Sequence, residues 1–317
     1  MNKLTSKTIN KQITNHSNSE NTISTAKQVI PSRRQGKFDQ ILSFLPFGFS
    51  SKPVIAMLRL EGIIGRVSNY KSGLSISVLN KLIEKTFKVD KLTAVCLLIN
   101  SPGGSPVQSE LICSRIMKLA EEKEIPVFSF VEDVAASGGY WLACAGSKIF
   151  ASKSSIIGSI GVVSASFGFH EAISKLGVER RVYTQGKNKS VLDPFSEAKS
   201  SDVKIIKNLQ KNIHEHFIDH VKTRRAGKLT QDDDILFNGE FWTGQTALDF
   251  GLIDGIDDVY SFIHKHYGTN AKIEYIEHKQ SWLKQKLGLS NDFASSLSEN
   301  LIDNAEEKLI KNKFNLL

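Results

Sequence analysis

The chain has 317 residues, 40% of them hydrophobic and 23% charged, a globular balance that excludes collagen-like, coiled-coil and wholly disordered classes. The net charge is +8, but residues 1–40 hold seven Lys or Arg against two acidic residues, so the excess belongs mainly to a tail and does not favour a nucleic-acid partner. The three widely spaced cysteines and the scattered histidines predict neither a disulfide framework nor a metal site.

The first fifty residues differ in composition from the rest of the chain. Residues 1–36 are rich in Ser, Thr, Asn and Lys, so we expect residues 1–50 to be disordered or loosely packed. The apolar run Ile41–Phe49 is interrupted by Pro46 and Gly48 and falls well short of the ~20 apolar residues that span a bilayer. With no transmembrane segment or signal peptide evident, we expect a cytoplasmic or peripherally membrane-associated protein.

Strand and helix patterns alternate from residue 54 to residue 131. Apolar runs at 54–65, 94–100 and 125–131 predict strands, and nearly continuous apolar character is typical of strands buried on both faces of a sheet. Apolar residues spaced three or four apart predict a helix around 79–83 and another over 107–119. This alternation predicts an α/β fold with a parallel sheet.

The second half of the chain is predicted to contain a long helix. Apolar residues recur every three or four positions over 203–221, a cap is expected from a side chain within 200–202, and Gly227 is expected to end the helix. A shorter amphipathic helix is predicted at 257–266. We expect the remaining residues, 269–317, to form a helical C-terminal appendage.

A glycine-rich turn, NSPGGS at 100–105, directly follows the predicted strand 94–100. Ligand sites of parallel sheets form beyond the carboxyl ends of the strands. Gly103 and Gly104 allow a tight turn and expose N–H groups that can stabilise an oxyanion. Taken alone, the turn is explained more simply as a connection between strand and helix.

A second turn, ASGGYW at 136–141, follows the predicted strand 125–131 and contains Ser137. Gly138 and Gly139 open a helix after it, so Ser137 is either a nucleophile at a helix N-terminus or an ordinary helix cap. The N–H of Gly138 is suitably placed to donate to an oxyanion. Because the two turns end consecutive parallel strands, they can face one cleft, which favours the nucleophile.

A serine nucleophile needs a base, and the histidines are not obvious candidates. We expect His170 at the start of a helix. His214, His216 and His220 are expected on or near the solvated face of the long helix. Lys189 instead precedes the apolar pair Val191 and Leu192. Burial lowers the pKa of a lysine, so that its neutral amine can act as a base. The alternative for Lys189 is a solvated loop lysine.

Several motifs together resemble the signal peptide peptidase A (protease IV) family, including its SohB-type members. They are LLINSPGG (97–104), VAASGGYWLACAGSKIFA (134–151), GSIGVV (158–163) and GQTALDFGLIDGI (244–256). The resemblance extends over residues 54–268. It implies a Clp-protease/crotonase-like α/β fold with repeated β-β-α units.

The resemblance also implies a Ser–Lys dyad. It assigns Ser137 as the nucleophile, Lys189 as the base because Pro194 stands five residues later, and Gly103 with Gly138 as the oxyanion hole. Related Clp peptidases have a histidine soon after the serine; here that region reads GSIGVVS and contains none. Lys187 does not fit the spacing to the proline.

We therefore divide the chain into a segment 1–50, a Ser–Lys peptidase domain 51–268 and the appendage 269–317. The expected function is a serine endopeptidase that hydrolyses unfolded peptides, such as remnant signal peptides or membrane-protein fragments, without a cofactor or metal. The resemblance implies a ring-like homo-oligomer in which the lysine of one protomer reaches the serine of the next. The alternatives are a crotonase-like acyl-CoA enzyme and a non-catalytic oligomeric scaffold.

Overall fold

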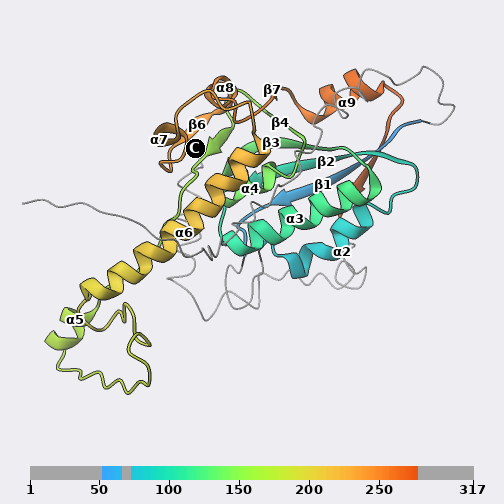
Figure 1. Cartoon of the computed structure of the whole chain (residues 1–317). Coiled ribbons are helices and arrows are strands. Elements are labelled where there is room, and N and C mark those ends of the chain that lie inside the picture. Colours follow the sequence, from blue (N-terminus) through green and yellow to red (C-terminus); the bar gives the residue numbers. More distant parts are fainter. Residues whose placement is uncertain (1–51, 66–72, 278–317) are drawn as a thin grey trace, which may run out of the picture. The chain divides into compact units, whose positions relative to one another are not determined.

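The computed structural model describes residues 52–65 and 73–277 (Figure 1). These residues lie in the second of the chain's two units, which begins at Ser51. The predictions for residues 1–50, including the run Ile41–Phe49, fall outside the described residues, as does most of the predicted appendage.

The described residues contain one sheet of eight strands. The strands are β1 (Val54–Glu61), β2 (Leu92–Ser101), β3 (Val127–Ala136), β4 (Lys148–Ala151), β5 (Ile156–Gly158), β6 (Phe241–Thr243), β7 (Gly255–Ile256) and β8 (Lys272–Ile276). The helices are α2 (Ile76–Thr86), α3 (Pro106–Lys123), α4 (Gly138–Ala143), α5 (His170–Lys175), α6 (Ser200–Arg224), α7 (Asp233–Leu236), α8 (Gly244–Asp249) and α9 (Val259–Tyr267).

The sheet is parallel except at one edge, as the alternating pattern predicts. Its order is β6-β5-β3-β2-β1-β8, with β4 paired to β3 and β7 paired to β4, and only β5 and β6 run antiparallel. β3 bonds to β4 along its first half and to β5 along its second half. The carboxyl ends of β2 and β3 therefore lie side by side, and the two glycine-rich turns begin there.

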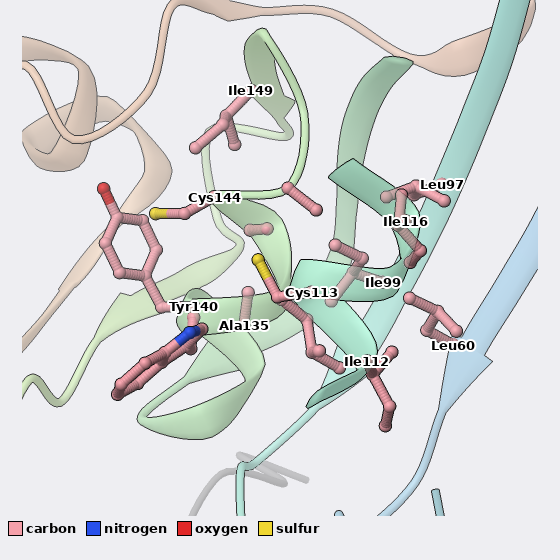
Figure 2. Close-up of a cluster of buried hydrophobic side chains, with 14 of the residues drawn as sticks. Leu60, Leu97, Ile99, Ile112, Cys113, Ile116, Ala135, Tyr140, Cys144 and Ile149 are labelled. Carbon is pink, nitrogen blue, oxygen red and sulfur yellow. The ribbon is translucent and has the colours of Figure 1, made fainter. Parts of the chain in front are cut away.

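Helices cover the two faces of the sheet. α2, α3 and α4 pack against one face and form the larger apolar core, and α9 packs with Phe262 against the other. Figure 2 shows how α3, α4 and β2 meet in the larger core. Ile112, Cys113 and Ile116 come from α3, and Leu97 and Ile99 come from β2. Tyr140 lies in α4, and Cys144 directly follows that helix. All six residues of α4, which begins directly after Ser137, are buried.

Three sequence predictions differ from the structure. β3 continues past the predicted end at residue 131, because the polar pair Glu132 and Asp133 interrupts the apolar run without ending the strand. No side chain caps α6; Lys199 precedes it, and Asp202 lies inside its first turn. The predicted helical appendage begins with strand β8, which pairs with β1.

Cys96, Cys113 and Cys144 are all free and buried, and burial raises the pKa of Cys144 to about 11. Within residues 52–65 and 73–277, no helix is both long and apolar enough to cross a membrane.

Candidate active site

The backbone turn at Ser137 is strained, and the serine side chain does not cap the helix that follows it. Ser137 adopts φ 52° and ψ −122°, a region that residues with a Cβ rarely occupy. The backbone is fixed because the Ser137 N–H donates to Gly158 O (2.8 Å), and its carbonyl accepts from Tyr140 N (2.9 Å). The side chain makes no capping hydrogen bond to α4. The cap interpretation therefore lacks its defining contact.

Gly103 brings the PGG turn into contact with this serine. A Cβ on Gly103 would lie 2.9 Å from Ser137 Cβ and 2.9 Å from Gly138 N. Gly103 also has a φ of 104°, which favours glycine. The turn is held from the other side, since Ile64 N donates to Gly103 O (2.8 Å). The structure thus brings together three of the four predicted site residues.

The backbone N–H groups of the two turns differ in whether they already have a hydrogen-bond acceptor. Gly138 is the first residue of α4, where helix geometry leaves the N–H without an acceptor inside the helix. The Gly103 N–H, in contrast, donates to Ser101 Oγ at 3.2 Å. The next residue, Gly104, is exposed, and the described residues provide no hydrogen-bond acceptor for its N–H. A Cβ on Gly138 would lie 3.4 Å from Gly104 N.

Lys189 is not brought to Ser137 within one chain. It lies in the segment 176–199 between α5 and α6, and Figure 1 shows this segment and α5 at the end of α6 that is remote from the sheet. Lys189 is exposed, whereas Val191 and Leu192 are half-buried. Within one chain, therefore, the apolar neighbours of Lys189 do not bury its amine, and the loop projects away from the body that could cover it.

His220 is a residue that the sequence analysis misplaced. Instead of lying near the solvated face of α6, its ring stacks on Trp141 of α4, with centroids 4.8 Å apart and planes at 14°. Burial, together with the nearby positive charge of Arg224, lowers the pKa of His220 to about 4. Its position three residues after Phe217, which also stacks on Trp141, was the signal in the sequence.

Arg224 is a second residue without a predicted role. Its Nε donates to Cys144 O at 2.7 Å and its Nη2 to Gly146 O at 3.0 Å, carbonyls that follow the C-terminus of α4. Positive charge at that end of a helix is stabilising. α6 therefore contacts the helix that Ser137 precedes through both aromatic stacking and charged hydrogen bonds.

Comparison with known proteins assigns the family. A model described as Peptidase family S49 matches residues 120–269, which include Ser137, Gly138 and Lys189. A putative protease of Synechocystis sp. is 30% identical over 209 residues, covering 66% of this chain and 72% of that relative. The chain belongs to peptidase family S49. S49 proteins are serine-type peptidases with a Clp-protease/crotonase-like fold, so both the predicted family and the predicted fold are confirmed.

Two further relatives extend this picture. A putative signal peptide peptidase SppA of Enterococcus faecium is 28% identical over 270 residues, covering 80% of this chain and 77% of that protein. A Brucella melitensis protein named Na(+)/H(+) antiporter NhaA is 49% identical over 272 residues, which is 83% of this chain but 37% of that protein. The chain thus spans little more than a third of this relative, and the rest of that relative lies outside the match. S49 membership favours a peptidase over the acyl-CoA enzyme.

Proposed function

We propose that this protein is a serine endopeptidase that hydrolyses unfolded peptides, with Ser137 as the nucleophile and Lys189 as the general base. The turn at Ser137 carries the proposal, because its backbone is held at a positive φ while its side chain makes no capping hydrogen bond. Such strain costs about 1–3 kcal/mol, persists only where the surroundings enforce it, and is concentrated at functional sites. Membership in peptidase family S49 supports the assignment.

In this mechanism, Ser137 Oγ bonds to the carbonyl carbon of the scissile peptide while its proton passes to the neutral amine of Lys189. The carbonyl oxygen becomes an oxyanion that accepts hydrogen bonds from backbone N–H groups. Lys189 then protonates the departing amine as the C–N bond breaks, leaving an acyl-enzyme. Water, which gives its proton to the same lysine, attacks the ester, and the serine regains its hydrogen.

The oxyanion donors proposed are the N–H of Gly138 and an N–H of the PGG turn. Gly103 can serve only if the oxyanion replaces Ser101 Oγ as the acceptor of its N–H, since the two atoms lie 3.2 Å apart. The adjacent N–H of Gly104 has no such competitor among the described residues. We therefore propose Gly103 or Gly104 as the second donor.

The exposed position of Lys189 supports a site that two protomers share. Burial favours the neutral amine of a lysine, and the chain's own residues leave Lys189 exposed. A neighbouring protomer in a ring-like homo-oligomer would cover the segment 176–199 and provide the serine. Such head-to-tail contact is the heterologous type that closes into rings.

The proposed substrates are remnant signal peptides or membrane-protein fragments. The name of the Enterococcus relative, a putative signal peptide peptidase, supports this class. Unfolded peptides of either kind can bind in extended form beside a sheet.

Labelling with a serine-directed phosphonate, followed by intact-mass measurement, tests the nucleophile. The wild type is expected to gain a single label and Ser137→Ala none. A non-catalytic scaffold would remain unlabelled in both forms, and a crotonase-like enzyme would keep its activity as Ser137→Ala. For the base, Lys189→Ala is expected to abolish peptidase activity while Lys187→Ala retains it, and the reverse result would contradict our assignment.

Mixed oligomers test whether the site is shared. Ser137→Ala and Lys189→Ala are each expected to be inactive alone, but co-expressed they should recover about a quarter of wild-type activity, because an intact serine then meets an intact lysine at roughly one interface in four. An inactive mixture would show that serine and lysine must come from one chain.

A further inference from the structure

We infer that Asp193 and Arg180 are positioning residues for Lys189, holding the segment that presents the lysine to its target serine. This inference rests on the proposed role of Lys189 as the base. Neither residue is expected to touch the substrate.

Asp193 has an enclosed side chain in a largely exposed segment. Its side chain is 7% exposed, although it lies only four residues after Lys189. One carboxylate oxygen accepts from Arg180 Nε at 2.9 Å, and the other accepts from Phe195 N at 3.1 Å. These two hydrogen bonds hold the pKa of Asp193 below its ordinary value, so the carboxylate stays charged and bonded at neutral pH.

Arg180 joins this carboxylate to an aromatic cluster. Its guanidinium carbon lies 5.0 Å from the centroid of the Phe195 ring, within the range of cation–π attraction. Phe195 in turn lies against Phe169, with ring centroids 5.7 Å apart. A single arginine therefore fixes Asp193 and packs over the residue two positions further along the chain.

Backbone contacts attach the same stretch to both neighbouring helices. Asp202, in the first turn of α6, accepts from Leu192 N at 3.2 Å. Phe169, which precedes α5, donates from its N–H to Pro194 O at 2.6 Å. Leu192 has a φ of 51°, a conformation that needs such support.

Residues 192–195 are thus fixed from several directions, while Lys189 itself makes, among the described residues, only a local backbone hydrogen bond to Gly186 O at 3.1 Å. The fixed stretch sets where the lysine stands relative to α6. Displacing a reacting group by about 1 Å can cost on the order of 100-fold in rate. An anchored loop therefore suits a base that must enter the site of another protomer.

Asp193→Asn tests the inference, with Glu179→Gln as its matched control. On the same segment, Glu179 Oε2 lies 2.6 Å from Arg181 Nη2. This ion pair is exposed and has no described contact with residues 186–195. We expect Asp193→Asn to lower kcat by about 10–100-fold with KM within about twofold, and Glu179→Gln to change neither. Arg180→Lys should retain more activity than Arg180→Ala. Equal kcat for Asp193→Asn and Glu179→Gln would overturn the inference.

Mixed oligomers separate positioning from general damage. Asp193→Asn is placed either on the Ser137→Ala chain, which donates the lysine, or on the Lys189→Ala chain, which donates the serine. Activity should fall only in the first arrangement, and equal loss in both would overturn the inference. If the parental mixture without Asp193→Asn is inactive, the shared site is what fails, and the kcat comparison with Glu179→Gln still decides the role of Asp193.

Discussion

At the scale of single residues, Gly103 lies directly against the turn that holds Ser137. Gly103→Ala would add a methyl group 2.9 Å from Ser137 Cβ at a φ of 104°. We expect it to abolish phosphonate labelling and to destabilise the fold by about 2–4 kcal/mol, since it combines strain with overpacking. Chemical denaturation and labelling rate measure the two effects.

Gly62 provides the matched control for this substitution. It has a similar φ of 107°, but a Cβ there would meet no atom within 4 Å. Gly62→Ala should therefore show the strain alone, about 1–2 kcal/mol, and keep most of the labelling. If both variants label equally slowly, the contact between the two turns is not what Ser137 needs.

His220 makes stability depend on pH. Its pKa in the fold is about 4 because of burial and Arg224, against about 6.5 when unfolded. As the pH falls, the unfolded chain therefore binds the proton before the folded chain does. The free energy of unfolding keeps its full contribution from His220 above the unfolded-state pKa, and it loses this contribution as the pH falls toward the folded-state pKa. Between about pH 7 and about pH 5 we expect a loss on the order of 2 kcal/mol from this residue.

Denaturation at both pH values tests this prediction. His220→Phe keeps a ring against Trp141 but cannot titrate, so it should remove the loss of stability that His220 causes between the two pH values. His216→Gln, at an exposed position of the same helix, should leave it intact. A wild-type loss that persists unchanged in His220→Phe would contradict the assignment.

At the scale of elements, α6 supports the short helix α4 that Ser137 precedes. α4 has only six residues, too few to be stable alone, so it depends on the Arg224 hydrogen bonds to Cys144 O and Gly146 O. We expect Arg224→Ala to cost about 1–3 kcal/mol and to slow phosphonate labelling, with Arg224→Lys intermediate. Lys222→Ala, an exposed charge of the same helix, should change stability by less than about 1 kcal/mol. Unchanged labelling of Arg224→Ala would show that α4 is held by other contacts.

The elements also show what the sequence could predict. β1, β2, α2 and α3 have regular apolar patterns and appear where expected, although β1 ends at Glu61 and not at the predicted residue 65. β4 to β7 have two to four residues each, too few for a pattern, and depend on pairing with distant strands. The contact of Gly103 with Ser137 could be predicted, because the two turns end consecutive parallel strands. The sequence left open whether Lys189 is buried or exposed, because an apolar neighbour in sequence does not tell whether a loop packs on its own chain.

At the scale of the whole molecule, the apolar stripe of α6 is only half covered. Its C-terminal part buries Phe217 and Val221, whereas in its N-terminal part Val203 is 38% and Leu209 54% exposed. A helix face that is apolar along its whole length favours burial along its whole length. The proposed homo-oligomer would provide the missing cover, with a second copy packing on this part of α6.

Leu209→Asp is expected to weaken that assembly without unfolding the chain. Burying a leucine contributes about 2 kcal/mol, so the loss should weaken each interface by about 30-fold and shift the distribution toward monomers in light scattering at low protein concentration. Asn208→Asp, on the opposite face and also exposed, is the control. Because dissociation would separate Ser137 from the lysine of the neighbour, the activity of Leu209→Asp per chain should rise with protein concentration. Full activity of a monomeric Leu209→Asp would contradict the shared site.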